Sequence, residues 1–242
     1  MSAGTLYGVG IGPGDPELLT VKATRVIAEA PVVAFFAKAG RRGNARGIVD
    51  CWLKAAHIEL PLYYPMTTES HFGDSPYREA LAAFYAESAA AIAAHLEAGR
   101  DVALLSEGDP LFYGSFMHLF TRLRERFAVT IVPGVSSICG GWGAAETPMT
   151  WGDDSLVVLP ATLPCEELVR RLALADAAVI MKIGRNFARA REALALAGMA
   201  ERAIYVERAT MANERVMALA EKDDAPAPYF SMILVPGAGR RP

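Results

Sequence analysis

Cysteine is scarce in this sequence of 242 residues, and its three copies stand far apart. An odd number of widely separated cysteines gives no disulfide framework, and none of them shares a zinc-type spacing with the four histidines. We therefore expect neither a disulfide-stabilised fold nor a structural or catalytic metal. The residues concerned are Cys51, Cys139, Cys165, His57, His71, His95 and His118.

An excess of basic residues is also missing, because 24 Lys and Arg stand against 27 Asp and Glu, a net charge of -3. Nucleic-acid binders need a basic excess to displace counterions from phosphates. The alanine-rich run over residues 80–94 is interrupted by Glu87 and Ser88, which argues against a membrane span. No charged leader with an apolar stretch opens the sequence. We expect a cytoplasmic protein with no nucleic-acid partner and no membrane association.

Strand-like and helix-like runs alternate over residues 1–145, which predicts an α/β domain with a parallel or mostly parallel sheet covered on both faces. Its predicted strands are residues 5–11, 32–37, 57–62, 101–105 and 128–132, and its predicted helices include residues 16–29, 46–56 and 112–126. After a connector, residues 153–242 predict a second, smaller α/β domain with a mixed sheet. Its predicted strands are residues 155–159, 177–182, 203–207 and 229–235, and its predicted helices are 165–174, 186–197 and 213–219.

The tripeptide Gly-Asp-Pro occurs twice, at residues 14–16 and 108–110, each time where a predicted strand ends and a helix begins. Glycine permits an unusual turn, aspartate caps the coming helix, and proline suits the first helical position. Two ordinary helix starts would explain both copies. However, open α/β proteins bind ligands at the carboxyl edge of the sheet. We therefore expect both loops to open on the same edge and to belong to a ligand site.

The first of these loops does not match the dinucleotide fingerprint G-x-G-x-x-G, because glycine recurs at every second position from Gly8 to Gly14. Asp15 would face a pyrophosphate with the wrong sign, and the second predicted strand leads to Lys38 without an acidic residue for a ribose. A nucleotide-dependent oxidoreductase is therefore disfavoured, and a small-ligand binding or regulatory protein is the alternative outside catalysis. Glycine loops with acidic residues suit a ligand that has a positive centre, an adenosine and no phosphate, as S-adenosylmethionine has.

Three segments together resemble the signature motifs of the tetrapyrrole methylases, S-adenosylmethionine-dependent enzymes of corrin and siroheme synthesis. They are residues 7–16 (YGVGIGPGDP), 106–110 (SEGDP) and 133–137 (PGVSS). The second half of the chain carries residues 179–182 (VIMK) and 205–210 (YVERAT), which are also similar to segments of such enzymes. The resemblance implies two α/β domains with an active site in the cleft between them, S-adenosyl-L-methionine as the methyl donor, and a homodimer.

Position by position, the resemblance assigns contact with the donor to loop residues near strand ends. These are Pro13, Glu107, Gly108, Asp109, Ser136, Ser137, Met181 and Ala209. Several have a plainer interpretation, because prolines, glycines and aspartates form turns and a methionine packs well in a core. No catalytic base is assigned. Glu107, Tyr113 and His118 are candidates only because they flank the second motif.

Within the family, four segments are most similar to enzymes that methylate the C-20 meso carbon of precorrin-2 in cobalamin biosynthesis. They are residues 35–38 (FFAK), 63–66 (YYPM), 111–113 (LFY) and 181–185 (MKIGR). The cobalt-containing form of this ring, or the substrate of another tetrapyrrole methylase, stays an alternative. A polycarboxylate ring would give loop arginines a purpose, since guanidinium pairs well with carboxylate. The arginines expected near its acetate and propionate arms are Arg41, Arg42, Arg46 and Arg185.

Overall fold

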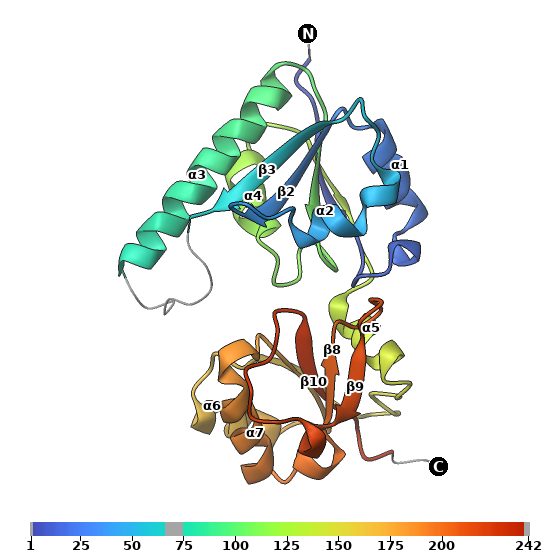
Figure 1. The fold of residues 1–242 in the computed structure, drawn as a ribbon. Coiled ribbons are helices and arrows are strands. Elements are labelled where there is room, and N and C mark those ends of the chain that lie inside the picture. Colours follow the sequence, from blue (N-terminus) through green and yellow to red (C-terminus); the bar gives the residue numbers. More distant parts are fainter. Residues whose placement is uncertain (1, 66–74, 240–242) are drawn as a thin grey trace. The chain divides into compact units, whose positions relative to one another are not determined.

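Each half of the chain forms one five-stranded β-sheet with helices packed on it (Figure 1). The structure, a computed structural model, describes residues 2–65 and 75–239. The chain divides into two units, Met1–Ser136 and Ser137–Pro242. Within the described ranges, none of the helices has the length and apolar content that crossing a bilayer requires.

The first unit contains a parallel sheet with the strand order β3-β2-β4-β1-β5, as the alternating pattern predicted. Its strands are β1 (Leu6–Gly10), β2 (Val32–Lys38), β3 (Ile58–Tyr64), β4 (Val102–Ser106) and β5 (Val129–Val132). Its helices are α1 (Val21–Glu29), α2 (Asn44–Ile48), α3 (Ser75–Glu97) and α4 (Phe116–Leu123), with short 3-10 turns η1 (Pro16–Leu18) and η2 (Asp50–Trp52). Helices α3 and α4 pack on one face of the sheet, and α1 lies on the opposite side (Figure 1).

The first predicted helix, residues 16–29, is divided in the structure, so this prediction was wrong in its extent. The chain forms η1, becomes extended at Leu19 and Thr20, and begins α1 at Val21. The Thr20 hydroxyl accepts a hydrogen bond from the Ala23 N–H group at 3.1 Å and so caps the second helix. A threonine competes with the helical backbone for such bonds, which makes it a better cap than an interior residue.

The second unit contains the expected mixed sheet, with the strand order β6-β7-β10-β8-β9. Its strands are β6 (Leu156–Pro160), β7 (Ala177–Met181), β8 (Ile204–Glu207), β9 (Arg215–Ala218) and β10 (Ser231–Val235). Its helices are α5 (Ser137–Ala144), α6 (Cys165–Leu172) and α7 (Phe187–Leu196), with 3-10 turns η3 (Gly184–Asn186), η4 (Ala200–Arg202) and η5 (Leu219–Glu221). Strands β6 and β7 are parallel, whereas β10 runs antiparallel to both β7 and β8. The two-sheet α/β class is therefore confirmed.

The helix predicted over residues 213–219 was wrong, because this segment forms strand β9. It pairs antiparallel with β8, and Val216 lies opposite Val206. Met217 packs against the buried cluster on one face while Val216 is exposed on the other, the alternation of an edge strand. Backbone pairing with β8 outweighs the modest helix preference of so short a segment.

Helix α5 packs on the sheet of the second unit, although the prediction placed residues 1–145 in the first domain. Gly141 lies so close to β10 that a Cβ atom there would be 2.4 Å from the Met232 sulfur. Ile138 and Trp142 of the same helix pack against the buried cluster that contains Met232 and Leu234. The absence of a side chain at Gly141 thus allows close packing of the helix on the strand.

Candidate functional site

Three loops meet at the carboxyl edge of the first sheet, because they follow the adjacent strands β4, β1 and β5. The loops after β1 and β4 pair directly: the Gly108 N–H donates to the Gly12 carbonyl at 2.8 Å, and the Gly12 N–H to the Gly108 carbonyl at 3.4 Å. The third loop joins them through Gly134, whose N–H donates to the Asp109 carboxylate at 3.1 Å. This confirms the prediction that both Gly-Asp-Pro loops open at one edge.

The glycines in these loops are required by backbone contact. A Cβ atom on Gly134 would lie 2.1 Å from the Gly108 carbonyl oxygen, and one on Gly10 would lie 2.5 Å from the Gly134 nitrogen. Gly12 and Gly108 also have positive φ angles of 77° and 67°, which favour glycine. The alternating glycines of the first motif therefore allow three backbones to approach one another.

The two aspartates of the repeated tripeptide do different work. The Asp15 carboxylate accepts the Glu17 N–H at 2.8 Å and opens η1, as an N-cap does. Asp109 accepts the Leu111 N–H at 2.9 Å with one oxygen and the Gly134 N–H with the other. It therefore caps a turn and also joins the β4 and β5 loops, while α4 begins only at Phe116.

The edge is acidic, because residues 8–16, 106–110 and 133–137 contain carboxylates and no lysine or arginine. Burial raises the pKa of the Glu107 carboxyl, and the backbone N–H groups of Glu107 and Ala45, which donate to it, offset this only in part. The Ser106 hydroxyl is buried at the end of β4 and has no hydrogen-bond partner among the described residues. A buried polar group left in this way is expected to meet a ligand or water.

The other two catalytic candidates lie on either side of the start of α4. Tyr113 has a positive φ of 55°, and its ring is exposed and makes an edge contact with Phe112 at a centroid distance of 4.9 Å. His118 lies in the first turn of α4, with its ring stacked on Tyr85 at 4.2 Å. Burial, and to a lesser extent the charge of Arg122, lowers the pKa of His118. A neutral imidazole at neutral pH is able to accept a proton.

In the second unit, the predicted donor contacts Met181 and Ala209 lie at or just beyond the ends of β7 and β8. These two strands are parallel to each other, since both are antiparallel to β10, so their ends share one edge. Met181 and Ala209 also pack against the same buried cluster, which contains Met232. The other predicted contacts are Pro13, buried after β1, Ser136, the last residue before α5, and Ser137, the first residue of α5. Contact of all these residues with a donor stays a prediction.

The predicted substrate arginines differ in their surroundings. Arg46 is buried and donates to Glu59 through two nitrogens, at 2.7 and 2.8 Å, and to Asp50 at 2.7 Å. Glu59 is the second residue of β3, so this guanidinium lies toward the amino end of the strands, and its contacts are those of a structural residue. Arg42 pairs with the same Asp50. Arg41 and Arg185 are exposed, and a role toward a substrate stays a prediction for all four.

The sequence motifs at residues 179–182 and 205–210 include the strained residues at the edge of the second sheet, but the sequence did not predict their strain. Lys182 follows β7 with φ 55°, and Arg208 and Thr210 follow β8 with φ 51° and 67°. Nothing in the sequence signals these angles, because a turn of this kind normally carries glycine or asparagine. The sequence did contain one signal of a functional position here, because the acidic Glu207 directly follows the apolar residues of β8.

Comparison with known proteins gives one consistent result. The family model described as Tetrapyrrole (Corrin/Porphyrin) Methylases matches residues 5–223. The chain is 56% identical over 242 residues to the precorrin-2 C(20)-methyltransferase of Sinorhizobium sp, covering 100% of this chain and 99% of that protein. It is 34% identical to the cobalt-precorrin-2 C(20)-methyltransferase of Salmonella typhimurium, covering 96% of each chain.

A solved structure shares the fold. The crystal structure of uroporphyrin-III C-methyltransferase from Thermus thermophilus complexed with S-adenyl homocysteine superimposes with a TM-score of 0.66 at 25% identity, covering 96% of this chain and 92% of that one.

The contact between glycine loops generates a stability prediction. We expect Gly134→Ala to lower the free energy of unfolding by about 3 kcal/mol, because the new methyl group must push apart the β1 and β4 loops. Gly143→Ala in α5 is the matched control, since a Cβ atom there meets nothing within 4 Å. Urea unfolding of both variants is the measurement. Equal stability of the two variants would contradict the close contact.

The Arg46 pair generates a pH prediction. The hydrogen bonds from Arg46 lower the pKa of Glu59 below its ordinary value of 4.5. The stabilisation is therefore complete above that value and is lost as the pH falls through the lower folded pKa. We expect Glu59→Gln to cost about 1 kcal/mol at pH 7, since the carboxylate is partly solvent-screened, and the difference from wild type to shrink below pH 4.5.

Denaturant unfolding across this pH range is the measurement. The matched control is Glu125→Gln, whose partner Arg124 is exposed, and we expect a change within about 0.5 kcal/mol at every pH. A Glu59→Gln penalty that is the same at pH 7 and pH 3 would show that the charge of Glu59 is not what stabilises the pair.

Proposed function

The chain belongs to the tetrapyrrole (corrin/porphyrin) methylases, and we propose that it transfers a methyl group from S-adenosyl-L-methionine to the C-20 meso carbon of precorrin-2. The product is precorrin-3A, and the step belongs to cobalamin biosynthesis. A cytoplasmic location, expected from the composition, and a homodimeric state, which the motif resemblance implies, are part of the same proposal.

One observation carries the choice of substrate. Identity to the Sinorhizobium precorrin-2 enzyme is 56% over the full length, whereas identity to the Salmonella cobalt-precorrin-2 enzyme is 34%. Both relatives are named as C(20)-methyltransferases and differ in the ring that they methylate. The higher identity to the precorrin-2 enzyme therefore favours the metal-free ring as the substrate. The cobalt-containing ring is the second candidate.

The chemistry of the first loop cluster fits the methyl donor. The cluster offers backbone groups, a buried serine hydroxyl at Ser106, and the carboxyl groups of Glu107 and Asp109. Such a set suits a sulfonium and an adenosine, and it would repel a phosphate. S-adenyl homocysteine, bound in the Thermus structure, is the donor without its methyl group. We assign donor contact to Pro13, Glu107, Gly108, Asp109, Ser136, Ser137, Met181 and Ala209.

The protein's own part in the reaction is positioning. The donor supplies a methyl group bonded to a positively charged sulfur, which leaves as a neutral thioether and needs no acid. The residues must then align the meso carbon with that methyl group, and such alignment accounts for a large share of rate acceleration. A proton must also leave the methylated carbon. Glu107, with its raised pKa, the neutral His118 and the exposed Tyr113 are the proposed candidates for holding it.

Recognition of the ring falls to exposed arginines. Arg41 and Arg42 lie in the segment after β2 and Arg185 lies in η3, and each carries a guanidinium of the kind that pairs with an acetate or propionate arm. Arg46 is a weaker candidate, because binding a ring carboxylate would require it to leave Glu59 and Asp50.

A methylation assay tests the function. We expect the purified chain to move label from [methyl-13C]S-adenosylmethionine to C-20 of metal-free precorrin-2, seen by NMR, with kcat/KM at least about tenfold higher than for the cobalt-loaded ring. Methylation of the cobalt ring alone would establish the second candidate. Retention of the donor without methylation of either ring would indicate a binding protein.

Substrate recognition is tested by charge reversal. We expect Arg185→Glu to weaken ring binding by about tenfold, because attraction to a carboxylate becomes repulsion, while affinity for S-adenosylhomocysteine is unchanged. Arg170→Glu, an exposed arginine of α6 paired with Glu167, is the control and should leave both affinities as they are. Fluorescence titration measures the affinity for the ring, and calorimetry measures the affinity for S-adenosylhomocysteine. Unaltered ring affinity in Arg185→Glu removes this residue from the substrate site.

A further inference from the structure

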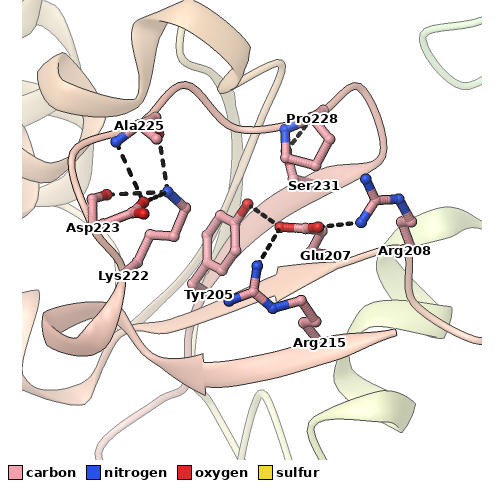
Figure 2. Close-up of polar contacts among 9 residues, drawn as sticks. All are labelled: Tyr205, Glu207, Arg208, Arg215, Lys222, Asp223, Ala225, Pro228 and Ser231. Atoms are coloured by element: carbon pink, nitrogen blue, oxygen red, sulfur yellow. Dashed lines mark hydrogen bonds and ion pairs between the residues drawn. The ribbon is translucent and has the colours of Figure 1, made fainter. Parts of the chain in front are cut away.

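Glu207 is a buried carboxylate that the proposed reaction does not use. It is the last residue of β8 and only 4% exposed. The Tyr205 hydroxyl donates to it at 2.9 Å, the Arg208 guanidinium pairs with its other oxygen, and an Arg215 nitrogen lies 3.7 Å away (Figure 2). A carboxylate removed from water in this way needs such partners.

The turn that follows Glu207 is strained. The Met211 N–H donates to the Arg208 carbonyl at 3.0 Å, so residues 208–211 form a β-turn. Both Arg208 and Thr210 have positive φ angles, and Thr210 is β-branched, which makes this conformation especially unfavourable. Backbone strain of this kind is retained only where neighbouring contacts fix it, and it concentrates at functional sites.

Side-chain contacts fix the turn on both sides of Ala209. The Arg208 guanidinium pairs with Glu207, and the Arg208 backbone N–H donates to the Phe230 carbonyl at 2.7 Å. The Thr210 N–H donates to the Glu214 carboxylate. Ala209 lies between the two strained residues and packs with Met181 against one buried cluster. The same edge carries a further strained residue, Lys182, directly after Met181.

We propose that Glu207 is a positioning residue that fixes the 208–211 turn through Arg208, so that Ala209 is presented to the methyl donor in its binding conformation. This inference rests on the proposed function, because donor contact at Ala209 is part of it. Tyr205 also holds Glu207, because its hydroxyl donates to the carboxylate oxygen that does not pair with Arg208. The Tyr205 ring in turn packs against Phe187 of α7 at a centroid distance of 5.8 Å.

Lys222 provides a matched control on the far side of the Tyr205 ring. Its ammonium group is buried, lies 5.6 Å from the Tyr205 ring centroid and donates to the Asp223 and Ala225 carbonyls (Figure 2). Removing this charge disturbs the same part of the fold without removing any contact of the 208–211 turn.

The experiment compares Glu207→Gln and Lys222→Met with the wild-type protein. Glutamine keeps the size of the side chain but loses the charge that holds Arg208. In donor-free protein we expect amide exchange at residues 208–211 to become at least about tenfold faster in Glu207→Gln only. We also expect about tenfold weaker binding of S-adenosylhomocysteine and a raised KM for the donor, with kcat and the KM for the ring little changed.

The outcomes separate the inference from the proposed function. Donor affinity and turn exchange in Glu207→Gln that equal those of wild type, or that change equally in Lys222→Met, would overturn the positioning role. Failure of the wild-type protein to bind S-adenosylhomocysteine would overturn the proposed function and donor presentation with it. Should Glu207→Gln not fold, Arg208→Met removes the same pair while Glu207 keeps its bond from Tyr205, and the same two losses are expected.

Discussion

The contact between glycine backbones at the carboxyl edge of the first sheet is the constraint on which the candidate site depends. Strands β4, β1 and β5 are neighbours, so their terminal loops reach the same place. They touch because Gly10 and Gly134 have no side chains to separate them from each other and from the Gly108 carbonyl. Asp109 then joins two of the loops through its two carboxylate oxygens. The three loops therefore form one hydrogen-bonded cluster.

The edge of the first sheet is acidic because the three loop segments contain no lysine or arginine. Helix α2 lies next to them and supplies a backbone N–H from Ala45 to Glu107, yet its arginine does not neutralise the edge. Arg46 is instead engaged with Glu59 near the amino end of β3. The loops are therefore acidic although the neighbouring helix carries an arginine. Acidic loops attract a positively charged group such as a sulfonium and repel a phosphate.

The sequence predicted those parts of the molecule that depend on local pattern. Apolar runs bounded by glycine and proline identified nine of the strands, and the repeated tripeptide identified the shared sheet edge, because both signals are local. Strand β9 was missed because its pairing with β8 is a tertiary contact. The helix predicted over residues 16–29 is divided because Thr20 is extended and caps α1 through its hydroxyl. The burial of Arg46 was equally out of reach, since its partner Glu59 is distant in sequence and only the crossover from β2 to β3 brings them together.

The two sheets build their strand-terminal turns in different ways, and this difference gives Glu207 its importance. In the first sheet the positive φ angles nearest the ends of β1 and β4 fall on Gly12 and Gly108, which adopt them without steric cost, and Tyr113 follows further along the β4 loop. At the ends of β7 and β8 they fall on Lys182, Arg208 and Thr210, each of which carries a side chain that opposes the conformation. The glycine turns of the first sheet are held by backbone contacts between Gly12 and Gly108 and by the Asp109 carboxylate. A turn made of larger residues must be held by side chains, and after β8 those are the carboxylates of Glu207 and Glu214. Arg208 is held through its own side chain and Thr210 through its backbone N–H, so both strained residues have a carboxylate partner within the protein. Under our proposal, the cost of ordering this turn is therefore met in folding and not in binding of the donor.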